Sequence, residues 1–224
     1  MKTLVTLACV LLLFGSALTV RAVYLHAKAE LAGLLIRRSW EHGSHSGEFR
    51  PPWPWADTRP VARLQIPRLH YDEIVLEGAT PRTLAFGPAR LLSSPQPGGP
   101  GNLVVAGHRT SWFRSLEDIQ RNDEIKLQWF DPNRKEVLQR GYSVTSVEIM
   151  SPDAARLLLA PTEHDALTLI TCFPFGASPL SPRRFVVRAN PLGSSRAAHS
   201  EAQHNEAFTR FSRDYEQTAF GAAK

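Results

Sequence analysis

The middle of the chain is dominated by short segments whose apolar and polar positions predict strands. Residues 61–66 (VARLQI) and 125–129 (IKLQW) alternate apolar and polar side chains, the period-2 pattern of a half-buried strand. Residues 102–106 (NLVVA) are predicted to form an apolar strand, and residues 166–171 (ALTLIT) a strand with a nearly continuous apolar face. Further strands are expected at residues 73–77, 135–138, 142–149 and 184–189, with a hairpin around residues 140–141.

Only short helices are expected between these strands. Pro81 suits the first position of a helix that begins near Thr80. Ser151 and Asp153 are alternative caps for a second helix that runs to about residue 159. About eight short strands with few helices predict a mainly β domain, a closed barrel or a sandwich, at residues 61–190.

The N-terminal segment is more apolar than the rest of the chain and shows no strand pattern. Lys2 precedes an apolar run at residues 4–20, which ends at Arg21 and spans about 25 Å as a helix. That length lies within the range for a bilayer-spanning helix. A retained signal anchor would leave Lys2 inside, whereas a signal peptide would be cleaved after Ala22. Both hypotheses export the rest of the chain.

The anchor is the favoured hypothesis because the helical pattern continues through residues 23–38 without a break. Residues 1–22 are therefore predicted to be a single-pass transmembrane helix in the cytoplasmic (inner) membrane, with the following domain on the extracytoplasmic, periplasmic side. Residues 23–60 are predicted to form a juxtamembrane helix and, from residue 41, a proline-rich spacer in which proline disfavours regular structure. Residues 191–224 are polar and predicted to be a flexible tail.

Composition and charge exclude several classes of function. The 224 residues are 43% hydrophobic, enough for a folded core, and Lys+Arg exceeds Asp+Glu by 26 to 21. The excess positive charge is scattered, and no basic run with interleaved aromatic residues indicates a nucleic-acid site. No CxxC motif and no Cys/His cluster has the spacing of metal ligands, so neither a metal nor another cofactor is expected.

Candidate chemistry centres on one cysteine. The chain has two cysteines, and Cys9 lies in the apolar run, which leaves Cys172 alone in the exported domain. A buried apolar cysteine is the structural alternative to a nucleophile. His108 also follows a predicted strand, and Arg183 and Arg184 open another, so the three positions are expected to meet at one rim of the barrel.

These three residue types together suit acyl transfer. A nearby cation favours the nucleophilic thiolate of cysteine. His108 would supply that cation and return a proton to a leaving amine, and a guanidinium would hold a carbonyl or a developing oxyanion. His164 is closer to Cys172 in sequence than His108 is, and spacing alone leaves these choices open.

The wider motif resembles a known family. Residues 168–172 (TLITC) resemble the TLxTC signature of the sortases, and residues 103–109 (LVVAGHR) are similar to the strand and histidine that sortases place upstream. The order of His108, Cys172 and Arg184 along the chain, and the spacing between them, also resemble the family. Residues 172–175 (CFPF) and 182–187 (PRRFVV) are most similar to the class D/E branch and its Gram-negative relatives.

The resemblance covers about residues 61–189 and implies an eight-stranded sortase barrel. It implies a cysteine transpeptidase that cleaves a C-terminal sorting signal of the LPxTG type in protein substrates. Cys172 would form a thioacyl intermediate, His108 would act as acid and base, and an amine of the cell envelope would accept the product. Arg184 is preferred to Arg183 because it directly precedes three apolar strand residues, and Thr171 is a candidate substrate contact.

Two other functions compete with this interpretation. An L,D-transpeptidase also combines Cys, His and Arg, but its cysteine stands in a Ser-x-Gly-Cys-Arg core, whereas Cys172 follows Leu-Ile-Thr. An anchored, non-enzymatic binding barrel would have an unreactive Cys172 and would tolerate changes at His108 and Arg184.

Overall fold

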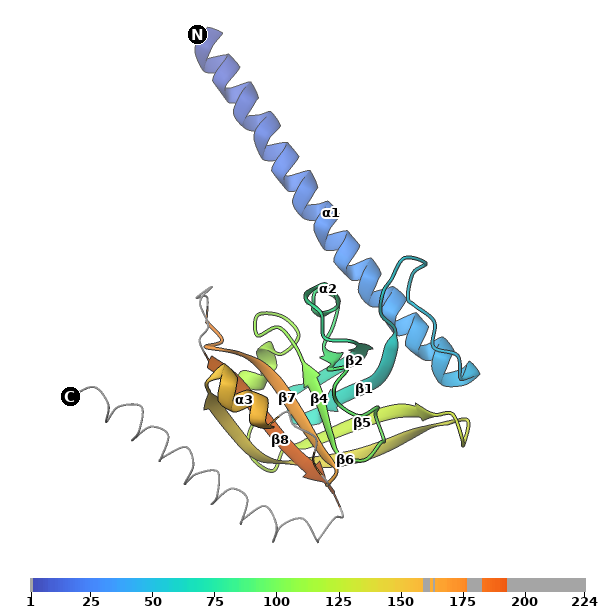
Figure 1. The fold of residues 1–224 in the computed structure, drawn as a ribbon. Coiled ribbons are helices and arrows are strands. Elements are labelled where there is room, and N and C mark those ends of the chain that lie inside the picture. Colours follow the sequence, from blue (N-terminus) through green and yellow to red (C-terminus); the bar gives the residue numbers. More distant parts are fainter. Residues whose placement is uncertain (1, 159–161, 163, 177–182, 193–224) are drawn as a thin grey trace, which may run out of the picture.

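Eight strands close into a barrel in the computed structural model, which describes residues 2–158, 162, 164–176 and 183–192 (Figure 1). The neighbours around the barrel are β1-β2-β3-β4-β7-β8-β6-β5. The strands are β1 (Pro60–Ile66), β2 (Tyr71–Glu77), β3 (Ala89–Arg90), β4 (Asn102–Ala106), β5 (Glu124–Asp131), β6 (Glu136–Met150), β7 (Ala166–Phe173) and β8 (Arg183–Pro191). The helices are α1 (Lys2–Ser46), η1 (Pro67–Leu69), α2 (Pro81–Leu84), η2 (Arg114–Asp118) and α3 (Pro152–Leu158).

The eight-stranded barrel that the sequence predicts is therefore present, and the interior follows from strand alternation. β1 alternates buried and half-buried residues along its length, so Leu64 and Ile66 point into the core. Leu167 and Leu169 of β7 enter the same core from the other side of the barrel. One end of the core is filled by the connection between β4 and β5, whose Phe113 and Leu116 are fully buried.

A second hydrophobic cluster lies outside the barrel, beneath α1. Ile36 and Trp40 of α1 are buried against Ile74 and Leu76, the outward-facing residues of β2. The helix ends where Gly47 takes a φ of +76°, a conformation that glycine adopts without strain, and its N–H bonds the carbonyl of Gly43. The C-terminal half of α1 is thus part of the folded domain.

A third cluster covers the outer face of β4, β7 and β8. Val104, Ile170 and Val186 lie side by side there, and Ala155 of α3 packs on them. Ser151 caps this helix, because its Oγ accepts a hydrogen bond from the N–H of Ala154 at 3.2 Å. The sheet at β4-β7-β8 is therefore buried on both faces.

Two local predictions were wrong. Residues 135–149 do not form a hairpin around Arg140 and Gly141, because β6 continues through both of them and pairs Gly141 with Lys126 of β5. The turn lies earlier, at residues 131–135, where Asp131 Oδ1 accepts the N–H of Asn133 and Lys135 takes a φ of +57°. The helix expected to stop before the proline-rich spacer also extends further, to Ser46.

The N-terminal part of α1 projects away from the barrel (Figure 1). Its apolar side chains at Leu12, Phe14 and Val20 are exposed. Within the described residues, no helix combines the length and apolar content needed to cross a membrane. The side chains of residues 4–10 and almost all of the predicted tail, residues 193–224, lie outside the described part of the chain.

The turn between β1 and β2 is held by an ion pair. Arg68 donates from Nε and Nη2 to the two carboxylate oxygens of Asp123, at 2.5 and 2.6 Å. Asp123 is buried and also accepts the N–H of Gln120 at 2.8 Å. The hydrogen bonds from Arg68 hold the pKa of Asp123 below its usual range.

We expect Trp40→Ala to lower the free energy of unfolding by about 3 kcal/mol, because it empties the centre of the cluster under α1. Urea unfolding followed by circular dichroism measures this loss. Trp55→Ala is the matched control, since Trp55 is 74% exposed and its removal should change stability by about 0.5 kcal/mol or less. Equal effects of the two variants would contradict the docking of α1.

We expect Asp123→Asn to cost about 2 kcal/mol at neutral pH, because the hydrogen bonds from Arg68 lose their charged acceptor. Because the pKa of Asp123 is lower in the folded than in the unfolded protein, the ionised carboxylate stabilises the fold at pH values above the unfolded-state pKa of about 3.9. This stabilisation is lost as the pH falls through the folded-state pKa of Asp123. The difference between variant and native protein should therefore shrink in acid. Urea unfolding over a pH series tests this, with exposed Asp153→Asn as control; a pH-independent difference contradicts it.

Candidate active site

Cys172 and Arg184 lie directly opposite each other on neighbouring strands. The antiparallel register of β7 and β8 pairs Cys172 with Arg184 and Phe173 with Arg183. The Cα atoms of such a pair are about 4.5–5.5 Å apart, and their side chains share one face of the sheet. Arg184, and not Arg183, is therefore the arginine at the level of the thiol. Cys172 stands inside β7, one residue further along than the strand end predicted at Thr171.

His108 reaches the same level from the other neighbour of β7. β4 and β7 are parallel, and their pairs run from Asn102 with Ala166 to Ala106 with Ile170 at a constant sequence offset. The N–H of Gly107 continues this ladder to the carbonyl of Ile170 at 3.2 Å. His108 and Cys172 are separated by the same offset, so the register, extended two residues past the end of β4, places them at the same level.

The side chains of Cys172 and Arg184 belong to the outer face of the barrel, and His108 follows the end of neighbouring β4. Side chains two residues apart share a face of a strand. Ile170 and Val186 pack in the outer cluster, and they precede Cys172 and follow Arg184 by two residues. Cys172 and Arg184 are half-buried and His108 is exposed, as groups that must meet a substrate need to be. We call the edge formed by the ends of β4 and β7 and the start of β8 the Cys172 rim.

Hydrogen bonds between β4 and β7 hold this register. Thr171 Oγ1 donates to the carbonyl of Gly107 at 2.7 Å, and Thr168 Oγ1 donates to Oδ1 of buried Asn102 at 2.8 Å. Thr171 is 3% exposed, and its hydroxyl joins the ends of the two strands. The substrate contact expected of Thr171 stays a prediction.

Gly107 is needed for a close approach beside the histidine. A Cβ at this position would lie 2.7 Å from the ring of Phe113. The backbone N–H of Phe113 also donates a hydrogen bond to the carbonyl of His108 at 3.0 Å. The buried Phe113 ring thereby fixes the backbone on which His108 stands.

Sequence reasoning missed two residues that shape the loops of the site. Arg109 Nη1 donates to the carbonyl of Pro174 at 2.5 Å, joining the loop after His108 to the loop after Cys172. Phe175 turns back into the core, where its ring lies 5.0 Å from that of Phe185. The only signals in the sequence were the place of Arg109 directly after His108 and the Phe-Pro-Phe that follows Cys172.

The alternative histidine is placed elsewhere. His164 precedes β7 and therefore lies at the opposite end of this strand from Cys172. The stretch of β7 between them corresponds to about 26 Å of extended chain. Cys9 stands in α1, and its side chain lies outside the described residues.

Comparison with known proteins decides the family. A sortase domain model matches residues 64–192, more than half of the chain. The chain belongs to the sortase family. It is 23% identical to sortase D of Bacillus subtilis (strain 168) over 172 residues, which cover 75% of this chain and 80% of the relative.

Solved sortases share the barrel. A sortase D5 transpeptidase of Clostridium perfringens matches with a TM-score of 0.57 and 20% identity, covering 73% of this chain and 99% of that one. Sortase A of Corynebacterium diphtheriae matches with a TM-score of 0.53 and 27% identity, covering 63% of this chain and 65% of that one. The protein is accordingly a cysteine transpeptidase, as predicted, and its similarity to a sortase D fits the class D/E resemblance.

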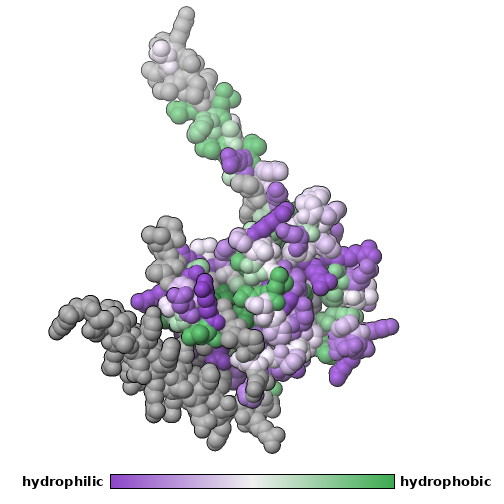
Figure 2. Space-filling view, viewed as in Figure 1, coloured by the Kyte–Doolittle hydropathy of each residue, from purple (hydrophilic) through white to green (hydrophobic). Residues whose placement is uncertain are grey.

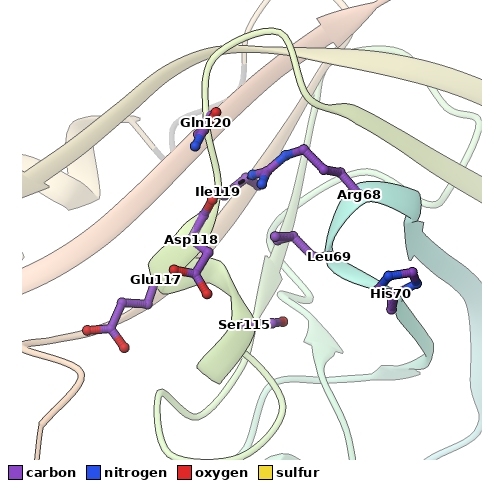
Figure 3. A pocket seen from close by; sticks show the side chains of 8 residues that line it. All are labelled: Arg68, Leu69, His70, Ser115, Glu117, Asp118, Ile119 and Gln120. Carbon is purple, nitrogen blue, oxygen red and sulfur yellow. Dashed lines mark hydrogen bonds between the residues drawn. The ribbon is translucent and has the colours of Figure 1, made fainter.

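A cleft of about 580 Å³ lies away from these residues. It is lined by residues of η1 and η2, and Arg68 reaches across it to the carbonyl of Asp118 at 2.5 Å (Figure 3). Neither Cys172, His108 nor Arg184 lines it, and η1 joins β1 to β2, across the barrel from β7. The cleft and the Cys172 rim are therefore separate features of the barrel.

We expect Thr171→Val to lower kcat about 10- to 100-fold with little change in KM, because small displacements of reacting groups have large effects on rate. The variant keeps the shape of the side chain but removes the bond that aligns the ends of β4 and β7. Steady-state cleavage of a fluorogenic peptide that contains a sorting signal measures the effect.

The matched control is Thr145→Val. Thr145 is on β6, and its hydroxyl donates a hydrogen bond to the carbonyl of Arg188 on β8 at 3.2 Å. This variant should leave kcat within about twofold. If both variants lose the same stability and the same activity, Thr171 has a general structural role only.

Proposed function

We propose that this sortase cleaves C-terminal sorting signals of the LPxTG type and transfers the cleaved protein to an amine of the cell envelope. One observation carries the proposal: Cys172 and Arg184 are paired on the outer face of β7 and β8, and His108 follows the end of β4, the other neighbour of β7. A peptide laid along that face meets a nucleophile flanked by a proton-transfer group on one side and a fixed cation on the other.

The first half of the reaction forms a thioester. The thiolate of Cys172 attacks the carbonyl carbon of the threonine in the signal, and the carbonyl electrons move to oxygen. As the intermediate collapses, the bond from threonine to glycine breaks, and the imidazolium of His108 gives its proton to the leaving glycine amine. Arg184 stabilises the oxyanion with its guanidinium, which carries charge and directed N–H donors from the strand opposite the thiol.

The second half reverses these roles. An incoming amine attacks the thioester carbonyl and gives a proton to neutral His108. The Cys172 thiolate then leaves, and a new amide bond joins the protein to its acceptor. Thiolate and imidazolium are both regenerated, so one imidazole serves as acid in the first half and base in the second.

We also propose that residues 4–20 anchor the enzyme in the cytoplasmic membrane, with the barrel on its extracytoplasmic side. This rests on the apolar sequence of the run and on the exposed leucine, phenylalanine and valine side chains of α1 at residues 11–20. Bare apolar side chains of this kind favour an apolar surrounding. The sorting-signal proteins would then meet the enzyme in the cell envelope.

The test is mass spectrometry of the full-length protein in detergent with LPxTG-type peptides and triglycine. The full chain is needed because Ile36 and Trp40 belong to the folded domain. We expect a peptide cleaved after threonine and joined to triglycine. Cys172→Ala should abolish this product, whereas Cys9→Ala should leave it unchanged.

Arginine variants make the test specific to the geometry. Arg184→Ala should lower kcat/KM about 100-fold or more, and Arg183→Ala, one residue away and opposite Phe173, less than about fivefold. Product from Cys172→Ala, or equal losses at the two arginines, would overturn the proposed roles. Cleavage without transfer to triglycine would mean that water is the acceptor under these conditions, contrary to the proposal.

A further inference from the structure

α1 runs along the outside of the barrel in a defined direction. Residues 29–37 of α1 border a groove of about 300 Å³ whose other wall includes Glu73, Phe86 and Trp112. Trp112 belongs to the loop that follows His108, and its Nε1 donates to the carbonyl of Leu84 at 2.9 Å. Arg37 bonds the carbonyl of Asp72 at 3.1 Å. This part of α1 therefore lies at the level of the Cys172 rim.

The strand pairings confirm that Asp72 and Glu73 are at this rim. Ala106, at the end of β4, pairs with Ala89, which pairs with Leu76 of β2. β2 is parallel to β3 and β3 antiparallel to β4, so lower numbers in β2 lie further toward His108. The start of β2 is thus on the same edge of the barrel as Cys172.

The other end of α1 reaches the opposite edge. A Cβ on Gly47 would lie 2.9 Å from the ring of Phe130, close to the end of β5. β5 runs away from the Cys172 rim, because it is antiparallel to β1 and pairs Lys126 with Gln65 and Gln128 with Arg63. From residue 29 to residue 47, α1 therefore passes from the Cys172 rim to the far edge of the barrel.

Residues before 29 consequently project beyond the Cys172 rim. Figure 1 shows β7 running toward the side from which the N-terminal part of α1 extends, and Figure 2 shows hydrophobic surface on that part, clear of the barrel. Only a short stretch of α1 separates Arg21, which ends the apolar run, from Ala29. It corresponds to about 12 Å along a helix.

We infer that the Cys172 rim faces the membrane, and that the helical stalk of residues 21–29 holds it at a short, fixed height above the bilayer. The inference rests on the proposed membrane anchor. A peptide bond held close to the bilayer would then lie within reach of the rim. The docking of Ile36 and Trp40 and the hydrogen bonds of Arg37 make the stalk and barrel one body, which prevents the rim from turning away.

Fluorescence in proteoliposomes measures this orientation without any need for activity. Full-length protein with Cys9→Ala and Cys172→Ala receives one cysteine, at Thr110 beside His108 or at Asn133 in the turn after β5, and both positions are exposed. A donor dye on each is paired with an acceptor dye on lipid head groups. We expect clearly greater energy transfer from position 110 than from position 133.

Equal transfer, or greater transfer from position 133, would overturn the inference. Protein that does not associate with the vesicles would overturn it too, together with the membrane anchor. Neither result would touch the proposed transpeptidase chemistry, which is measured separately on soluble peptide in detergent.

An extended stalk tests the consequence for substrates. An alanine-rich helical insert of about 14 residues after Val23 adds about four turns, or about 21 Å, and nearly preserves the phase of the helix. Cleavage of a soluble signal peptide should stay within about twofold. Cleavage of a vesicle-tethered substrate with its signal close to the bilayer should fall about tenfold or more, and a spacer of matching length in the substrate should restore it. An unchanged rate on the short tethered substrate would overturn the inference.

Discussion

The parallel pairing of β4 with β7 is the constraint on which the rest of the active site depends. Its constant sequence offset equals the separation of His108 from Cys172, so the register, extended past the end of β4, places them at the same level. A slip of β7 by one residue would turn Cys172 toward the barrel core, because side chains alternate between the faces of a strand. The buried Asn102–Thr168 and Thr171–Gly107 hydrogen bonds oppose such a slip, since any other register leaves their polar groups without partners.

The same alternation separates stability from chemistry along each strand. Leu167 and Leu169 pack in the barrel core. Ile170 packs on the outer face beneath α3, and Cys172 lies two residues further along the same face. On β8, Val187 serves the core and Val186 the outer face that carries Arg184. The reactive groups are therefore the last members of outward-facing rows whose earlier members are buried, which fixes their position while leaving them open to a substrate.

Periodic strand patterns predicted a mainly β domain, a closed barrel or a sandwich, and the motif resemblance implied the eight-stranded barrel that the structure has. The catalytic roles that motif and order suggest for His108, Cys172 and Arg184 stay predictions. Sequence reasoning failed where the pattern was ambiguous. Gly141 looked like a turn, yet β6 continues through it because its partner strand β5 supplies an unbroken ladder. The predicted number of eight strands is correct only because two errors cancel. The prediction divided β6 into two strands, and it missed β3, whose two residues are too few to show a periodic pattern.

Tertiary contacts account for the remaining differences. Nothing local in residues 168–172 says that the hydroxyl of Thr171 points inward to Gly107, because its partner lies on another strand, far away in the sequence. Arg109 and Phe175 likewise acquire their roles from residues that only the closed barrel brings near, Pro174 and Phe185. The sequence supplied the candidate residues of the site, but not the side chains that align their strands and loops.

The docking of α1 follows from the shape of the barrel itself. A closed barrel has an outer face as well as a core, and the outer face of β2 presents Ile74 and Leu76. Burying them requires an apolar partner, which Ile36 and Trp40 supply from the helix that also carries the N-terminal apolar run. Releasing α1 from the barrel would expose both sets of side chains to water. The contact that completes the outer packing of the barrel therefore also fixes the direction of α1 relative to the Cys172 rim.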